Sequence, residues 1–466
     1  MTIKKIVIFC ILGGFFVFGT LAAQATETVP TLTLKFFDNK SQLVSEKDIF
    51  DQGFAGVTDL SAVDLGGDGI NELVVSYGFN DFPEVKILRL DGSLVNSWHP
   101  YARGFEGQVN VVGGDVDGDG KVEIITAPGE GGGPHIRVFD GYGNVETGFM
   151  ATEQTYRSGV EVALGDVTGD GKKDIICSLI EAGKYSVKFF DNTGRTVLPA
   201  ITIDDGEVLS PLKVTAFDLT GDGKAEIVVG SGLGNLPQVY VYDQSGALLS
   251  KFLAYGENFR GGVDMAVMRM AEENVIVTSP GFGGGPHVRF FNWKGEAREP
   301  GKFFVYPEGF RGGINLVTGN FGGGATLAVI PATFMQDISL TKFVKFIKVN
   351  LTEQKLYAYD RGHLVKSFLI SSGKRGFETP VGTFSVFRKR ELVRMTWFYG
   401  PNDPNNYDLP NVPYTMSFKG AYTLHGAYWH SNWGHPMSHG CINISVPLSR
   451  WLYYWTPLNT PVIIER

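Results

Sequence analysis

The chain has 466 residues, of which 43% are hydrophobic and 19% are charged, and 61 of them are glycine. This length exceeds what one ordinary hydrophobic core supports, so we expect about two or three domains. The formal net charge of −8, without a cluster of basic residues, argues against nucleic acid as a partner.

The first 25 residues have the pattern of an export signal. Lys4 and Lys5 precede an apolar run at 6–18, and the Ala-Gln-Ala sequence at 23–25 is typical of a cleavage site. We expect cleavage there. An uncleaved membrane anchor is the alternative, because the apolar run approaches the length that spans a bilayer. In both cases the rest of the protein lies outside the cytoplasm, in the cell wall, the periplasm or the medium.

An internal repeat follows, marked by four copies of an acidic loop. The copies begin at Asp64, Asp115, Asp166 and Asp218, which are 51, 51 and 52 residues apart. Each loop leads into a short β-branched stretch, a glycine-rich turn and a second strand that ends in an aromatic residue and aspartate. Several short strands per period, without helical periodicity, predict the blades of a β-propeller.

Two degenerate units, at 262–281 and 313–330, extend the repeat to six blades. The sixth unit stops near Pro331, before its outer strands, and the segment 32–38 near the chain start matches the missing strands. We therefore predict a six-bladed propeller over residues 26–335, in which the N-terminal segment completes the last blade. This closure leaves no open sheet edge.

The acidic loops have the character of calcium sites, because carboxylates at their first, fifth and ninth positions can converge around a hard cation. They differ from EF-hands, since strands flank them and the twelfth position lacks glutamate. They resemble the FG-GAP (integrin alpha-type) repeats, and this resemblance, over residues 31–332, implies structural Ca²⁺. The alternative is a metal-free Asp-Gly turn. The candidate ligands are Asp64, Asp68, Glu72, Asp115, Asp117, Asp119, Glu123, Asp166, Thr168, Asp170, Asp174, Asp218, Thr220, Asp222 and Glu226.

The acidic loops are not equal as candidate sites. The Asp115 loop has four carboxylates and is the strongest candidate, whereas Gly66 removes one from the Asp64 loop. Two other glycine-rich segments, at 128–135 and 280–287, lack the lysine and the helix of a phosphate-binding loop. We interpret them as turns between blade strands, where glycine tolerates positive φ.

After a linker at 336–341, residues 342–466 show a different pattern. Alternating apolar residues predict a β-meander at 346–351, 355–360 and 363–370, with a further strand at 379–386. The stretch 388–418 is rich in aromatic residues, proline and asparagine and has little strand pattern. It predicts a long loop that either covers a site or packs against the domain.

One cysteine stands out as a candidate nucleophile. Cys10 belongs to the export signal, and Cys177 lies in an apolar run that predicts a buried strand, which leaves Cys441. An exported chain without a disulfide framework has little reason to keep a lone thiol unless it is used. A thiol becomes a nucleophile when a base takes its proton. The spacing allows either His425 or His439 to be that base.

The order of these segments resembles the L,D-transpeptidase (YkuD) catalytic domain. The motifs that carry the resemblance are Ser-Ser-Gly-Lys, Thr-Pro-x-Gly-Thr-Phe, His-Gly and Ser-His-Gly-Cys-x-Asn, within residues 342–466. The resemblance implies a β-sandwich, which makes the whole chain mainly all-β. It implies that no cofactor takes part in catalysis and that the substrates are peptidoglycan stem peptides.

The same resemblance assigns roles to individual residues. Cys441 is the nucleophile and His425 its base, oriented by a backbone carbonyl at Gly426. The backbone N–H groups of His439, Gly440 and Cys441 form an oxyanion hole, in which a glycine permits close approach. Ser438 and Asn443 brace the loop by hydrogen bonding and lie at the substrate groove. Apart from the resemblance, Trp429 lies near the thiol in sequence and either lines that groove or packs the domain.

Other interpretations remain open from the sequence. Four histidines and the thiol suit zinc by residue type, although their spacing matches no usual zinc pattern: His425, His430, His435, His439 and Cys441. The leading hypothesis is an exported transpeptidase that a propeller positions on a cell-wall or protein ligand. The alternatives are an L,D-carboxypeptidase that uses the same thiol, and an adhesin whose C-terminal domain attaches it to the wall.

Overall fold

The computed structural model describes residues 33–49, 56–78, 83–105, 107–204, 206, 208, 210–270, 273–334, 343–360 and 363–466. The predicted export signal at 1–25 and the predicted linker at 336–341 lie outside the described residues. Within the described ranges, no helix has the length and apolar character needed to cross a bilayer.

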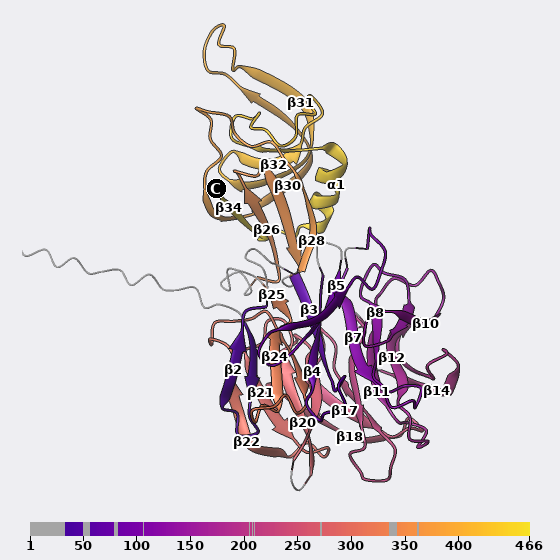
Figure 1. The fold of residues 1–466 in the computed structure, drawn as a ribbon. Helices are drawn as coiled ribbons and strands as arrows, with labels where there is room; N and C mark the ends of the chain where they lie inside the picture. The colour runs from indigo at the N-terminus through magenta and orange to yellow at the C-terminus, as the bar shows by residue number, and fades with distance from the viewer. Residues whose placement is uncertain are drawn as a thin grey trace, which may run out of the picture.

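Six antiparallel sheets make up the N-terminal part of the chain (Figure 1). From the central channel outward, their strands are β3 (Gly56–Val63), β4 (Glu72–Gly78), β5 (Glu84–Leu88) and β6 (Leu94–Trp98); β7 (Val109–Gly114), β8 (Glu123–Pro128), β9 (His135–Phe139) and β10 (Val145–Met150); β11 (Glu161–Gly165), β12 (Asp174–Glu181), β13 (Lys184–Phe190) and β14 (Thr196–Ile203); β15 (Lys213–Phe217), β16 (Glu226–Gly230), β17 (Gln238–Tyr242) and β18 (Leu248–Leu253); β19 (Val263–Arg269), β20 (Asn274–Pro280), β21 (His287–Phe291) and β22 (Ala297–Phe304); and β23 (Ile314–Thr318), β24 (Leu327–Pro331), β1 (Leu34–Phe37) and β2 (Leu43–Lys47).

The innermost strands contact one another in cyclic order, from β3 through β7, β11, β15 and β19 to β23, and β23 contacts β3 again. The predicted six-bladed propeller is therefore confirmed. In the sixth blade β1 pairs antiparallel with β24, so the N-terminal segment completes the last blade, as the sequence predicts. β25 (Thr333–Phe334) then pairs with β3 of the first blade, close to the point where the chain leaves the propeller.

The blades owe their stability to strands that are buried on both faces. All six residues of β8 are buried, whereas the outermost strand β10 is largely exposed. Cys177 is completely buried in β12, and burial raises the pKa of its thiol. This cysteine is therefore a core residue, as its apolar neighbours predict.

One position repeats on all six innermost strands and carries a polar side chain in every blade: Asp59, Asn110, Glu161, Lys213, Asp264 and Asn315. Lys213 Nζ lies 2.9 Å from Glu161 Oε2 and 3.7 Å from Asp59 Oδ1. Five of the six residues, all but Asp59, line a cavity of about 700 Å³. The C-terminal domain contributes to the same cavity through Lys345 and Trp455, so this domain covers one mouth of the channel.

The C-terminal domain is a β-sandwich that stands on the propeller, with β28 nearest to it (Figure 1). One sheet has the order β28-β27-β26-β34-β29, the other β30-β31-β32-β33, and the bounds are β26 (Lys345–Asn350), β27 (Lys355–Asp360), β28 (His363–Leu369), β29 (Gly382–Ser385), β34 (Pro461–Glu465), β30 (Arg388–Trp397), β31 (Tyr407–Lys419), β32 (Tyr422–Gly426), β33 (Ile442–Ile444) and α1 (Val446–Trp455). Val349, Met416, Leu424 and Leu452 belong to the shared core between the sheets and α1.

The predicted long loop at 388–418 is wrong. β30 and β31 form a hairpin there, paired from Arg388 opposite Ser417 to Trp397 opposite Tyr407. β30 is half-buried or exposed along its whole length, so its two faces differ little in polarity and the sequence shows no period-two pattern. The hairpin points away from the propeller, at the far end of the molecule (Figure 1).

Candidate active site

Two segments that are distant in sequence run side by side and fix the loop that carries Cys441. Ser371 and Asn443 exchange two backbone hydrogen bonds, of 3.0 and 2.9 Å, and the Lys374 N–H donates to the Ser438 carbonyl at 3.0 Å. The buried hydroxyl of Thr379 accepts a hydrogen bond from the Gly373 N–H and donates one to the Gly440 carbonyl, both 2.9 Å long. The loop that carries Cys441, here called the thiol loop, is therefore held by the segment 371–379 as well as by hydrogen bonds within its own turn.

Gly440 is required by both backbone conformation and space. Its φ is +108°, a region that side chains with a Cβ rarely adopt, and a Cβ there would lie 2.5 Å from Tyr422 Cε1. The Gly440 N–H donates to Ser438 Oγ at 3.0 Å, and the Ser438 hydroxyl donates to the Cys441 carbonyl. Ser438 thus braces the loop.

The bracing by Ser438 changes the expected oxyanion hole. Because the Gly440 N–H is engaged, it is not free for an oxyanion in this conformation. No hydrogen-bond partner is seen for the N–H groups of His439 and Cys441 in the described part of the chain. These two groups are therefore the available donors, and the expectation of three is corrected to two.

The thiol lies against Thr423 of β32 and against Ala421, the residue before that strand. The Thr423 hydroxyl donates to Cys441 Sγ at 3.4 Å, and Sγ lies 3.8 Å from the Ala421 carbonyl oxygen. Burial raises the pKa of the Cys441 thiol, and hydrogen bonds from Thr423 oppose this only in part. A thiol in this environment needs a base to become a nucleophile.

His425 has the better geometry for that base. It is 2% exposed on β32, and its Nδ1 lies 3.2 Å from the Gly426 carbonyl oxygen. Since a carbonyl only accepts, Nδ1 carries the proton and Nε2 is left with its lone pair. Burial lowers the pKa of His425 to about 4, so the ring is neutral at physiological pH. Parallel pairing of β32 and β33 sets His425 beside Asn443, two residues after the thiol.

His439 has a different environment. Its ring packs against Phe377 and Tyr407, with ring centroids 4.5 and 5.3 Å away. Its Nε2 is buried without a hydrogen-bond partner among the described residues, and burial lowers the pKa of the ring. Among the described residues, no hydrogen bond orients a His439 nitrogen as the Gly426 carbonyl orients Nδ1 of His425. The sequence spacing alone could not decide which of the two histidines is the base.

The remaining candidates lie around this pair. Asn443 Nδ2 lies 2.9 Å from His430 Nε2, so this side chain fixes His430 and does not brace the thiol loop. Trp429 is 36% exposed, and its ring centroid lies 5.7 Å from that of His425, at the rim of the site. Within the described ranges, the only group of three or more acidic, histidine or cysteine side chains with converging ligand atoms lies in the propeller, so the geometry gives the zinc interpretation no support.

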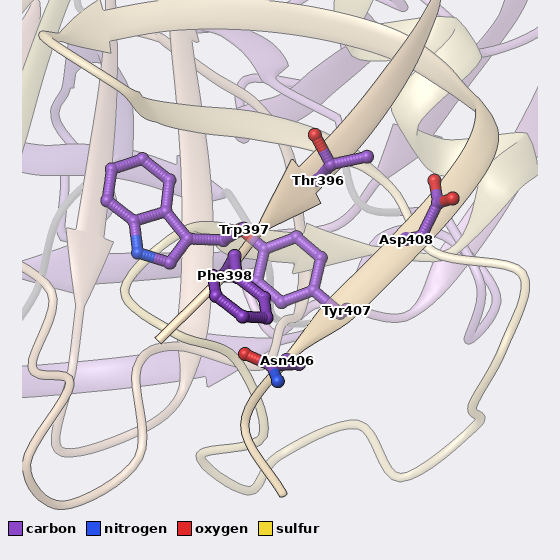
Figure 2. A pocket seen from close by; sticks show the side chains of 6 residues that line it. All are labelled: Thr396, Trp397, Phe398, Asn406, Tyr407 and Asp408. Carbon is purple, nitrogen blue, oxygen red and sulfur yellow. The ribbon is translucent and has the colours of Figure 1, made fainter. Parts of the chain in front are cut away.

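The tip of the β30–β31 hairpin brings exposed aromatic rings beside His439. Tyr399 and Tyr407 both contact the His439 ring. On the same hairpin, a pocket of about 580 Å³ is lined by Thr396, Trp397, Phe398, Asn406, Tyr407 and Asp408 (Figure 2). Phe398 is 71% exposed, so these rings are not part of the domain core, and the arrangement favours a cover over a packing role.

Comparison with known families identifies both parts of the chain. Residues 344–464 match the YkuD family, described as the L,D-transpeptidase catalytic domain. The C-terminal region is an L,D-transpeptidase catalytic domain. Residues 115–177 and 166–229 match the FG-GAP-like repeat, so the propeller of this chain carries FG-GAP-like blades.

Individual proteins are similar to the C-terminal part of this chain. "Putative L,D-transpeptidase YciB" of Bacillus subtilis is 29% identical over 135 residues, 26% of this chain and 65% of that protein. "Probable L,D-transpeptidase 3" of Mycobacterium tuberculosis is 32% identical over 106 residues, 21% of this chain and 37% of that protein. The chain thus spans less than two thirds of the length of either relative. The solved catalytic domain of the Enterococcus faecium L,D-transpeptidase is 27% identical, with a TM-score of 0.23, over 26% of this chain and 96% of that one.

In the propeller, one acidic loop brings its carboxylates together. The ligand oxygens of Asp115, Asp117 and Glu123 all lie within 4.8 Å of one another. Glu123 is buried, and burial raises its pKa to about 7. Asp119 is held away by Lys121, whose Nζ lies 2.7 Å from its Oδ2.

The other acidic loops satisfy their own carboxylates. Threonine replaces Asp117 in the next two loops, where the Thr168 hydroxyl donates to Asp174 at 3.3 Å and the Thr220 hydroxyl to Glu226 at 3.0 Å. In the first loop, Asp64 accepts the N–H groups of Asp68 and Gly69. Within these loops as described, no other group of three acidic side chains brings its oxygens together, although the Thr168 hydroxyl also lies 3.4 Å from Asp166 Oδ1. The candidate ligands outside the Asp115 cluster are Asp64, Asp68, Glu72, Asp119, Asp166, Thr168, Asp170, Asp174, Asp218, Thr220, Asp222 and Glu226.

Two residues of the catalytic domain escaped the sequence analysis. Thr379 latches the thiol loop, and Thr423 bonds to the thiol itself. Thr423 carried a usable signal, because residues two apart on a strand face the same side and His425 was already a candidate. Thr379 begins the Thr-Pro-x-Gly-Thr-Phe motif, but the motif did not show its role, since its contact with Gly440 exists only in the folded domain.

Proposed function

We propose that this protein is an exported cysteine L,D-transpeptidase that forms a thioester between Cys441 and a peptidoglycan stem peptide. The observation that carries the proposal is that the Cys441 thiol lies against Thr423 of β32, where His425, two residues further along the strand, is neutral and has its Nδ1 tied to the Gly426 carbonyl. The matching family supplies the substrate class, since L,D-transpeptidases act on peptidoglycan peptides.

The geometry supports a reaction in two halves. His425 Nε2 takes the Sγ proton as sulfur attacks the carbonyl carbon of the L-residue, and the oxyanion accepts the N–H groups of His439 and Cys441. The His425 imidazolium then gives its proton to the amine of the departing D-residue as the amide C–N bond breaks. An amine of a second stem next attacks the thioester, His425 takes its proton, and the thiol re-forms as the cross-link is made.

The low pKa of His425 has a consequence for both halves. Burial makes the imidazolium form of His425 unstable, so the resting state combines a neutral imidazole with a thiol. The same instability makes the imidazolium a strong acid toward the leaving amine. A resting ion pair of thiolate and imidazolium is not expected.

The test is mass spectrometry of the protein and its products after incubation with stem tetrapeptides. We expect a thioester adduct on the wild type and on Cys177→Ala, and none on Cys441→Ala. Cross-linked dimers should form only where the adduct forms. Dimers made by Cys441→Ala would refute the proposal, and shortened stems without dimers would identify an L,D-carboxypeptidase instead.

We also propose that the Asp115 loop holds a structural Ca²⁺ through Asp115, Asp117 and Glu123. Three carboxylates with convergent oxygens suit a hard cation, and backbone carbonyls and water complete such sites. The calcium-bound propeller would position the catalytic domain on a cell-wall or protein ligand, outside the cytoplasm. If the protein were instead an adhesin, its propeller would still bind its ligand, and the protein would keep its function, when Cys441 is replaced.

A further inference from the structure

Lys374 lies beside the thiol loop in a fixed position, although the reaction described above does not use it. It is half-buried, and its backbone N–H donates to the Ser438 carbonyl at 3.0 Å. Its Nζ lies 3.1 Å from Asn405 Oδ1 at the hairpin tip and 5.2 Å from the centre of the Phe377 ring. The Phe377 ring in turn packs on His439. The ammonium group therefore stands against the wall of the active site.

This ammonium has no acidic partner within the described ranges. Two other lysines of the domain are paired with acids: Lys345 with Asp360 at 3.3 Å and Lys348 with Glu465 at 2.9 Å. The acid on the same side as Lys374 is Asp403, but its Oδ1 accepts the backbone N–H and the side-chain Nδ2 of Asn405. A half-buried cation that keeps its charge unpaired favours the binding of an anion.

The backbone places this cation close to the reacting carbonyl. A Cβ on Gly373 would lie 2.9 Å from Gly440 Cα, so the residue before Lys374 touches the oxyanion loop. One residue of extended peptide spans about 3.5 Å. In the proposed donor, the α-carboxylate of the departing D-residue lies one residue beyond the carbonyl that Cys441 attacks. A lysine side chain that starts beside the oxyanion loop can reach it.

We propose that Lys374 binds the terminal α-carboxylate of the donor stem and makes the enzyme select a C-terminal peptide bond. This inference rests on the proposed function. Nζ has three donors, so it can bind a carboxylate oxygen while keeping its hydrogen bond to Asn405. Since Asn405 belongs to the hairpin tip, the same lysine links the bound carboxylate to the cover of the site.

The test compares a donor tetrapeptide that has a free C-terminal carboxylate with the same peptide as a C-terminal amide. Loss of a charge-assisted hydrogen bond reduces kcat/KM about 10- to 100-fold. For the wild type we expect amidation to cause this loss, mainly through KM. Lys374→Gln should show the same loss on the free acid and almost no further loss on the amide. Lys374→Arg should keep most of the discrimination, and Arg375→Gln, which removes an exposed neighbouring charge, should behave as the wild type.

The outcomes separate this inference from the proposed function. An equal loss on both peptides in Lys374→Gln would mean a structural role, and no loss on either would mean no contact with the donor. Both results overturn the inference and leave the transpeptidase intact. Absence of any Cys441 adduct in the wild type, with either peptide, would instead refute the proposed function and this inference together.

Discussion

The Asp115 loop and the thiol loop are both short and rich in glycine, but they acquire their chemistry by opposite routes. The Asp115 loop draws its three carboxylates from nine consecutive residues, and in the next two blades Thr168 and Thr220 stand in place of the carboxylate of Asp117. The thiol loop contributes only the nucleophile and two N–H groups. The other groups come from separate parts of the fold: the base is His425, the hydroxyl that fixes the loop belongs to Thr379, and the cation is Lys374.

This difference predicts how each loop responds to change. A substitution in the acidic loop should have a local effect, because neighbouring loops satisfy their own carboxylates. A substitution around the thiol loop should impair the reaction even where it touches neither the thiol nor the substrate. The following predictions are arranged from the largest expected effect to the smallest.

Gly440→Ala should reduce the rate of Cys441 acylation by about 100-fold or more, because the new methyl group collides with Tyr422 and displaces the oxyanion donors. Thermal stability should fall as well, because Gly440 is buried and has a positive φ that alanine rarely adopts. The control is Gly376→Ala, which has a similar positive φ but no atom within 4 Å of its Cβ position. Acylation at the wild-type rate in Gly440→Ala would show that the loop adapts to the side chain.

Thr379→Val should lower kcat about tenfold and destabilise the domain by about 1–3 kcal/mol, because it leaves the Gly373 N–H and the Gly440 carbonyl without their partner. The matched control is Thr456→Val, which removes a buried hydroxyl that bonds to Leu452 at the end of α1. Both variants should lose stability in chemical denaturation. Only Thr379→Val should lower kcat. An equal decrease of kcat in both variants would mean that the Thr379 hydroxyl does not position the thiol loop for the reaction.

The same contrast explains what the sequence could and could not predict. The sequence repeat predicted the blades, their number and the closure of the ring by residues 34–37. This prediction needed only the repeat itself and local strand patterns. The cysteine and its two candidate bases followed from a compact motif. The hairpin at 388–418 was missed because β30 has no buried face and β31 buries residues only in its second half, so the hairpin shows no period-two pattern along its length. The convergence of Asp117 with Glu123, and its absence elsewhere, depends on side-chain hydrogen bonds that a loop consensus does not contain.

Calcium should raise the melting temperature of the wild type, because a ligand that binds the native state stabilises it. Asp117→Thr, which gives this loop the residue of its neighbours, should abolish the shift, whereas Asp119→Asn should retain it. Ionised Glu123 is the form that binds, and its pKa is about 7 without metal, so the calcium affinity should fall between about pH 8 and pH 6. Scanning fluorimetry with and without a chelator measures the calcium-induced shift in melting temperature for the wild type and for both variants. Loss of this shift to the same extent in both variants would contradict the proposed ligand set.

The smallest effect concerns the channel, where Asp264 faces Lys213, Asp59 and Glu161 and accepts the N–H groups of Met265 and Leu316. Burial raises the pKa of Asp264 to about 7, well above the unfolded value near 3.8. A raised carboxyl pKa stabilises the fold below the unfolded value, and this contribution is lost as the pH rises through the folded value. The propeller should therefore melt a few degrees higher at about pH 5.5 than at about pH 8.5.

Asp264→Asn should flatten this dependence without moving the acidic limb below about pH 4, where paired carboxylates such as Asp191 become protonated. Glu123 also titrates near neutral pH but does so in both proteins, so the difference between their melting curves isolates the channel. An unchanged slope in Asp264→Asn would place the titrating group elsewhere. The catalytic domain closes the mouth of the channel above Asp264. The melting temperature of Lys345→Ala at the same two pH values therefore tests whether the catalytic domain keeps water away from Asp264 and so keeps the pKa of Asp264 raised.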